Sequence, residues 1–226
     1  MALTSGVVID FAKMNRVLAI DPSQRVMRVE CGATLAQVNR AARPHGLMFA
    51  PTVSTSDRAT IGGMISTDAA GKGSAVYGKT SDHVISMRAH FVGDECLETG
   101  DVNDAALSRL IEGGERVGEL CRCADEIDRT MRDEIARAFP RLPRRVSGYD
   151  LAGIRSGVDS GFGLNRLLCG SEGTLAIVSK ATLRLTPIPQ HRALVAVSYT
   201  TFDEAVVDAA RVARCKPHAI EAMDGM

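Results

Sequence analysis

The sequence of 226 residues lacks an excess of charge of either sign, because 27 Lys and Arg residues balance 27 Asp and Glu residues. A balanced charge offers no general attraction for nucleic acid or for an anionic membrane surface. No apolar run approaches the roughly 20 residues that cross a bilayer, and the first residues lack the basic and apolar regions of a secretory signal. We therefore expect a cytoplasmic globular protein with no transmembrane segment and no nucleic-acid partner.

The sequence also lacks the ligand spacings of a metal site. Its cysteines, at positions 31, 96, 121, 123, 169 and 215, include no C-x-x-C pair, and its histidines are dispersed. Zinc and iron–sulfur sites use closely spaced ligands, so we predict no metal site and reduced cysteines. Cys121 and Cys123 should point to different faces of a predicted helix.

The periodicity of apolar residues predicts an α+β chain. Alternation and β-branched residues predict strands over Val7–Asp10, Val26–Cys31, Val84–Val92, Glu95–Thr99, Thr174–Leu185 and Val195–Thr200, with a hairpin turn at Gly93-Asp94. Spacing of three and four predicts helices after Thr34, over Asp101–Glu112 with Asp101 near the N-cap, over Arg116–Phe139, and after Thr201 or Asp203. Pro187 and Pro189 predict a subdomain boundary.

Small residues gather in the segment Ala59–Gly78, which has glycines at 62, 63, 71, 73 and 78. Glycine lets the backbone approach a ligand and adopt positive φ, and successive amide N–H groups then form a cradle that suits a diphosphate. The hydroxyl groups of Thr60 and Ser66 add donors. The alternative is a glycine-rich surface loop without a ligand.

A second segment, Gly170–Val178, is a turn with two glycines that leads into an apolar strand. Backbone groups at such a strand end could reach a flat heteroaromatic ligand, and the alternative is a plain β-turn. A third segment, Ser147–Leu151, places Tyr149 after a glycine, and the alternative for this ring is core packing.

These three segments, in this order, resemble the family of FAD-linked oxidases and dehydrogenases with a PCMH-type, vanillyl-alcohol-oxidase-like flavin domain. The first pattern of the family corresponds to Ala59–Gly63, Asp68–Gly71 and Tyr77-Gly78. The second corresponds to Gly148–Leu151 and Gly170–Ser179, followed by Pro187 and Pro189. The resemblance implies an α+β, PCMH-type FAD-binding domain with mixed sheets flanked by helices over residues 1–189, and the beginning of a substrate (cap) domain over residues 190–226.

The resemblance also implies non-covalent FAD, because the segment Ala59–Gly78 contains no histidine. The residues that it places at the cofactor are Pro51, Thr60, Ile61, Gly62, Gly63, Gly71, Tyr77, Gly78, Glu172, Gly173, Ile177 and Val178. Asp68 stands where the family usually has asparagine, and a carboxylate facing a diphosphate would repel it. We therefore expect no direct contact from Asp68.

The helix Arg116–Phe139 and the approach from Pro140 to Tyr149 resemble the large D-2-hydroxy-acid dehydrogenases, which act on D-2-hydroxyglutarate, D-lactate or glycolate and carry an appended iron–sulfur domain. The resemblance implies hydride transfer from a D-2-hydroxy acid to FAD, with electrons passing to an acceptor or to the iron–sulfur domain. Alternatives are another flavin oxidase, of aldonolactone or alcohol type, and a non-catalytic apo fragment. The basic residues Arg137, Arg141, Arg144 and Arg145 are a solvated helix end or a contact for a carboxylate or a partner domain.

Two parts of the family pattern have no counterpart in the sequence. A glycine-rich phosphate loop would precede Val7–Asp10, and the rest of the substrate domain would follow Asp224. We therefore expect a chain that is truncated at both ends, retains FAD weakly or not at all, and is inactive alone. We predict no general base within it, because Asp82 and His83 are more typical of loop capping. Any membrane association would run through an electron-acceptor partner.

Overall fold

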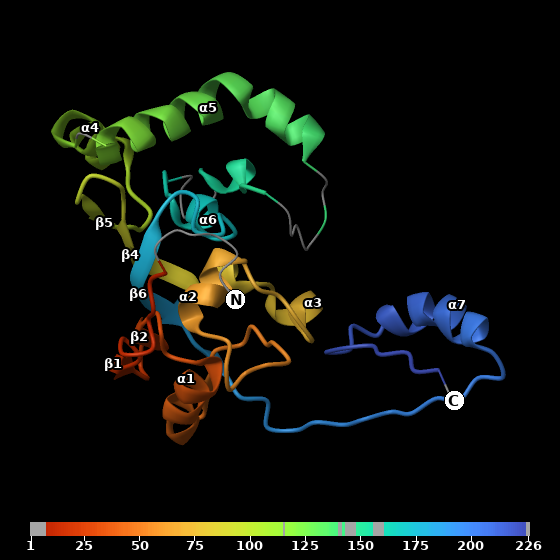
Figure 1. Ribbon diagram of the computed structural model, residues 1–226. Coiled ribbons are helices and arrows are strands. Elements are labelled where there is room, and N and C mark those ends of the chain that lie inside the picture. Colours follow the sequence, from red (N-terminus) through yellow and green to blue (C-terminus); the bar gives the residue numbers. More distant parts are fainter. Residues whose placement is uncertain (1–7, 115, 140–141, 143–147, 156–160, 225–226) are drawn as a thin grey trace.

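The computed structural model describes residues 8–114, 116–139, 142, 148–155 and 161–224, and within them it confirms the α+β class (Figure 1). The strands are β1 (Val17–Asp21), β2 (Val26–Glu30), β3 (Leu47–Met48), β4 (Val84–His90), β5 (Cys96–Glu98), β6 (Ile177–Arg184) and β7 (Thr186–Pro187). The helices are α1 (Leu35–Ala42), α2 (Ile61–Ser66), α3 (Ser74–Tyr77), α4 (Asp104–Gly113), α5 (Arg116–Ala138), α6 (Asn165–Leu168) and α7 (Phe202–Ala213), with short 3₁₀ helices at Arg43–His45, Thr80–Asp82 and Leu151–Gly153.

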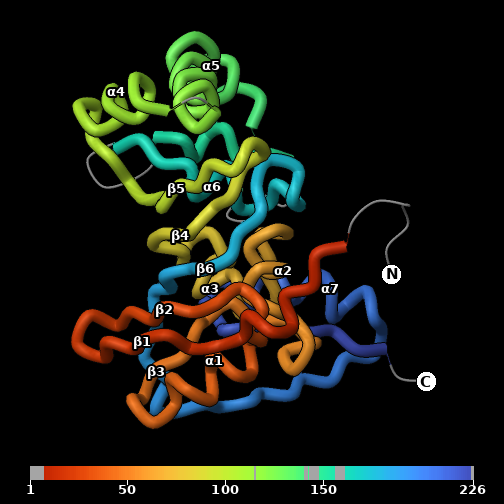
Figure 2. The backbone as a smooth tube through the Cα atoms, turned by 60° about the vertical axis from the view of Figure 1, so that its left-hand side comes forward, coloured from red at the N-terminus to blue at the C-terminus, as the bar shows by residue number. Residues whose placement is uncertain are grey.

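The main sheet has the strand order β1-β2-β6-β4-β5, and a small second sheet pairs β3 with β7. Each pairing between the described strands is antiparallel. The late strand β6 lies in the middle and joins the β1–β2 hairpin to the β4–β5 hairpin, as the tube in Figure 2 shows. The turn that precedes β6 therefore opens at the centre of the sheet.

The core forms on one face of this sheet. Ala181 and Leu183 of β6 and Met27 and Val29 of β2 are buried at alternate positions, as the two-residue period of a strand requires. In β4 the register shifts between Val84 and Ser86, so the buried residues there do not follow strict alternation.

The long helix α5 confirms the predicted helix over Arg116–Phe139, and it lies across α6 at one end of the molecule (Figure 1). Cys121 is buried and Cys123 is exposed, as expected from their spacing. The buried face also contains Asp125 and Asp128, whereas Met131 is exposed. Helical period alone predicts an apolar stripe, and it does not reveal these two buried carboxylates.

The chain after β7 lies apart from the core. None of the described residues 189–224 is buried, and an extended segment leads from β7 to α7 (Figure 1). Thr201 caps α7 by accepting a hydrogen bond from the Glu204 amide, as one of the two predicted caps. No helix in the described part of the chain is long and apolar enough to span a membrane.

Several predicted boundaries are wrong. Val8–Asp10 and Val195–Thr200 form no strand. A strand needs hydrogen bonds to a neighbouring strand as well as an alternating pattern, and neither segment pairs with a neighbour in the described structure. The first strand is β1, which was not predicted, and β6 starts at Ile177 instead of Thr174. Asn103, not Asp101, caps α4. Arg141, Arg144 and Arg145 lie outside the described residues.

We expect Thr34→Ala to lower the free energy of unfolding by about 1 kcal/mol, because Thr34 caps α1. Its hydroxyl accepts from the Gln37 amide at 3.2 Å, and the Gln37 side chain accepts from the Thr34 amide at 2.8 Å. Urea unfolding measures the change. Thr55→Ala is the matched control, since Thr55 is exposed and its hydroxyl bonds to no other described residue. An equal loss in both variants would contradict the capping role.

Candidate functional site

The two glycine-rich segments lie side by side and are hydrogen-bonded to each other. The Gly170 amide donates to the Ile65 carbonyl, and the Glu172 amide donates to the Ser66 carbonyl, each at 2.9 Å. Ile65 and Ser66 are the last residues of α2, so the second segment closes the C-terminal end of this helix. The fold thus brings together two parts of the chain that are more than a hundred residues apart, as the resemblance requires.

The start of α2 is anchored to the connection between β2 and α1. Thr60 caps the helix by accepting from the Gly63 amide at 3.2 Å. The amides of Ile61 and Gly62 donate to the carbonyls of Ala33 and Cys31, each at 2.8 Å. A Cβ at Gly62 would lie 3.1 Å from the Cys31 Cβ, so the glycine permits this close packing. The Ile61 side chain is fully buried in the core, and Gly63 is exposed.

The loop that follows α2 is held by the segment after Pro51, which is buried. The Thr52 hydroxyl donates to the Lys72 carbonyl, and a Cβ at Gly71 would overlap the Thr52 carbonyl oxygen. Gly73 has a φ of +87° and Gly78 a φ of +78°, in the left-handed region that favours glycine. The predicted residues Pro51, Gly71 and Gly78 thus shape one loop.

This loop presents a set of amide donors. In the described structure, the N–H groups of Gly71, Lys72, Gly73 and Ala75 bond to no other part of the protein. The N–H groups of Gly173, Leu175 and Ala176, in the second segment, are also without a protein partner in those residues. Backbone groups need a partner or water, and clustered amides suit an anion. The donor set therefore fits the diphosphate of a dinucleotide.

The second segment has a strained backbone beside an open surface. Gly170, Glu172 and Gly173 have φ values of +84°, +51° and +78°, and Glu172 is the one non-glycine residue among these three. Such backbone strain is enriched at functional sites. No atom lies within 4 Å of a Cβ placed on Gly173, so the space above it is open.

Apolar surface for a flat ring lies next to this turn. Ile177 begins β6 and is 40% exposed, and Val178 is half-buried. Tyr149 is 42% exposed, so it is not a core residue, and its hydroxyl lies 2.7 Å from the Thr174 hydroxyl. The third segment of the sequence pattern is thus tied to the second.

Asp68 is buried, and its carboxylate is satisfied within the protein. It forms an ion pair with the buried Lys79 and accepts from the Ser81 amide at 2.8 Å and from the Ser81 hydroxyl at 3.0 Å. A partner of opposite charge is what a buried carboxylate needs. The sequence pattern missed Lys79 and Ser81, although the acidic residue in place of asparagine signals that a cation must lie nearby.

Asp82 and His83 support the same loop. Asp82 accepts from the Lys79 amide at 2.9 Å and from the Arg166 guanidinium at 2.8 Å. Burial raises the pKa of Asp82, but these hydrogen bonds outweigh it and hold that pKa below its ordinary value. The His83 Nε2 lies 2.7 Å from the Tyr77 carbonyl oxygen. Both contacts are those of loop capping.

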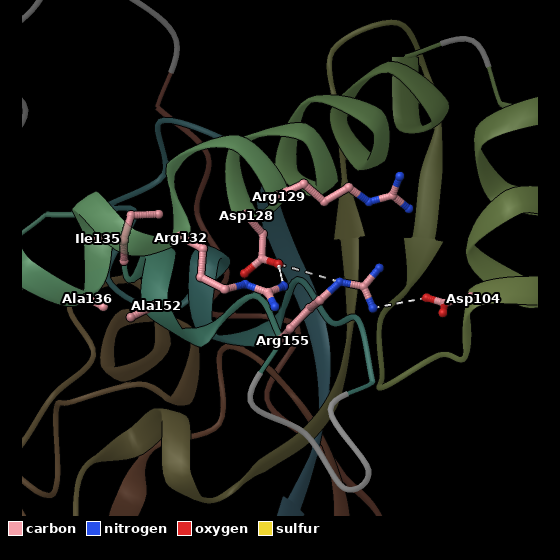
Figure 3. A pocket seen from close by; sticks show the side chains of 8 residues that line it. All are labelled: Asp104, Asp128, Arg129, Arg132, Ile135, Ala136, Ala152 and Arg155. Carbon is pink, nitrogen blue, oxygen red and sulfur yellow. Dashed lines mark hydrogen bonds and ion pairs between the residues drawn. The ribbon is translucent and has the colours of Figure 1, made fainter.

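A separate cavity of about 610 Å³ lies along α5, and its lining comes from α5, from Asp104 and from the region of Ala152 and Arg155 (Figure 3). Arg155 donates to Asp125 at 2.7 Å and to Asp104 at 3.0 Å, and it lies 3.6 Å from Asp128. The hydrogen bond to Asp125 is the main reason that the pKa of Arg155 is raised. The charges at this cavity are compensated within the protein, so they fasten α5 to the domain.

Comparison with known proteins agrees with the geometry of the two segments. Residues 1–100 match the model of the FAD binding domain family, which confirms FAD as the predicted cofactor. The chain is 46% identical, over 99% of its length, to a D-2-hydroxyglutarate dehydrogenase of Pseudomonas putida, and 40% identical to that of Escherichia coli. It is 29% identical over 97% of its length to a D-lactate dehydrogenase of Archaeoglobus fulgidus. The chain spans 22% of the length of the first two relatives and 38% of the third.

We expect Gly71→Ala to lower the free energy of unfolding by about 1–3 kcal/mol, because the added methyl group would force the Thr52 backbone away. Urea unfolding measures the loss. Gly100→Ala is the matched control, since no atom lies within 4 Å of a Cβ at that position. An unchanged stability of Gly71→Ala would show that the loop is not packed as described.

We expect Lys79→Met to destabilise the protein by about 3–5 kcal/mol, because it leaves the Asp68 carboxylate buried without its cation. The double variant Asp68→Asn/Lys79→Met removes both charges and should regain a large part of the loss. Chemical unfolding of the three proteins gives the comparison. A double variant as unstable as Lys79→Met would refute the ion pair as the cause.

Proposed function

We propose that this chain is the FAD-binding part of a flavin-dependent dehydrogenase that oxidises a D-2-hydroxy acid. The observation that carries the proposal is the junction of the two glycine-rich segments, which are hydrogen-bonded to each other and each present amide groups without a protein partner in the described structure, beside backbone with positive φ. The match of residues 1–100 to the FAD binding domain family supports the identity of the cofactor.

In this proposal, different residues of the chain contact different parts of the cofactor. The amides of Gly71, Lys72, Gly73 and Ala75 would hold the diphosphate, and Thr60, Gly62 and Gly63 would keep α2 beside it. Gly173, Ile177 and Val178 would border the flat ring system. Bound FAD would supply the hydride acceptor for oxidation at C2 of the acid.

The division of the whole protein is part of the same proposal. Residues 1–189 would form the flavin domain and residues 190–226 the beginning of a substrate domain, which agrees with the lack of buried residues over 189–224. The names of the relatives favour D-2-hydroxyglutarate or D-lactate as substrate. An electron acceptor or an iron–sulfur domain would take the electrons onward. The general base would come from outside the described residues, since Asp82 and His83 are engaged in the loop.

The cofactor assignment predicts that this chain binds FAD weakly but saturably. FAD should be lost on gel filtration. In a titration, however, binding should change the absorbance spectrum of FAD, and added FAD should raise the melting temperature of the protein. A ligand at 100 times its dissociation constant adds about 2.7 kcal/mol of stability. ADP, which keeps the diphosphate, should compete with FAD, whereas riboflavin, which lacks it, should compete less.

The matched glycine variants sharpen this test. Gly71→Ala should weaken FAD binding, and Gly100→Ala should not. A chain whose melting temperature and flavin spectrum respond to no concentration of FAD would overturn the cofactor assignment. The substrate is tested separately on the full gene product, where D-2-hydroxyglutarate or D-lactate should bleach the flavin absorbance and their L-enantiomers should not.

A further inference from the structure

The segment after α7 returns to the loop that follows α2, which contains Gly71, Gly73 and Gly78. In Figure 1 the chain after α7 runs back beside α3. In the described part of the chain, every ion pair and ring contact that joins residues 190–224 to the earlier residues falls on Lys72 or Tyr77. The contact therefore connects the C-terminal segment with the loop whose amides face the proposed diphosphate.

Three interactions make up this contact. The His218 imidazole lies against the Cα of Gly73, so closely that a Cβ on Gly73 would overlap the ring. The rings of His218 and Tyr77 meet edge to face, with centroids 5.3 Å apart and planes at 63°. The Lys72 ammonium lies 2.8 Å from the Glu221 carboxylate.

Gly73 has a double reason to be glycine. Its φ of +87° is strained for any other residue, and a Cβ would overlap the imidazole in its observed position. Gly73 and both of its neighbours in the contact, Lys72 and Tyr77, lie in the loop that carries the free amides. The conformation of Gly73 therefore affects both the position of the His218 ring and the orientation of those amides.

We propose that His218 and Glu221 form a clasp that holds the loop Lys72–Tyr77 in its cofactor-binding geometry. This rests on the proposed function, to which it adds two positioning residues. The clasp is weak, because the ion pair is exposed at both ends and a single ring contact contributes little. A weak contact is easily shifted by a ligand, so FAD binding and seating of the C-terminal segment favour each other, and the coupling is reciprocal.

The test compares His218→Ala, His218→Phe and the control His191→Ala in this same chain. His191 is exposed in the extended segment and makes no contact with the loop in the described structure. Two quantities are measured for each protein: FAD affinity by titration, and hydrogen exchange of residues 72–78 and 216–221 with and without FAD.

We expect His218→Ala to weaken FAD binding about fivefold, at the low end of known couplings between sites. Exchange of residues 72–78 should become faster in the absence of FAD, while protection of β2 and β6 stays unchanged. His218→Phe keeps a flat ring, so its FAD affinity and hydrogen exchange should be closer to those of the parent chain. His191→Ala should equal the parent chain in both quantities. In the parent chain, FAD should slow exchange of residues 216–221.

Two results would overturn the clasp. One is FAD affinity in His218→Ala equal to that of the parent chain. The other is unchanged exchange of residues 72–78 in His218→Ala without FAD. If no variant and no parent chain binds FAD, the proposed function fails, and exchange of the FAD-free proteins still decides whether His218 holds the loop.

Discussion

The structure depends on the closure of α2 by the second glycine-rich turn. Two hydrogen bonds, from Gly170 to Ile65 and from Glu172 to Ser66, help to satisfy the carbonyls at the end of this helix, which have no partner within the helix itself. The turn leads directly into β6, the middle strand of the main sheet. One junction therefore joins the sheet, the helix and both segments of the candidate site, and displacement of β6 would separate them.

Around this junction, the acidic side chains of Asp68 and Asp82 are paired within the protein, so they do not occupy the free amides of the loop. The carboxylate of Asp68 would oppose an anion, but Lys79 and Ser81 take it up in the interior. Asp82 is likewise engaged by Arg166 and a backbone amide. In the described loop, the N–H groups of Gly71, Lys72, Gly73 and Ala75 remain without protein partners. This division of roles explains how a loop with acidic neighbours can still suit a diphosphate.

The two ends of the described domain are held in different ways. At α5, a partly buried network of Arg155 with Asp125 and Asp128 fastens the helix. The segment after β7 contributes no buried residue and meets the loop through an exposed ion pair and one ring contact. Local stability follows burial, so the C-terminal segment is the part most able to respond to a ligand at the loop.

Local sequence determined the elements whose causes are local. The N-cap at Thr34 and the period of α5 were predictable because neighbouring residues create them, and glycine spacing, through family resemblance, indicated both segments of the candidate site. Only the tertiary structure decided which segments pair. Val17–Asp21 forms strand β1, Val195–Thr200 forms no strand, and Asp68 pairs with Lys79. The physical reason is that strands and buried charges are stabilised by partners distant in the chain, and alternation or composition does not identify those partners.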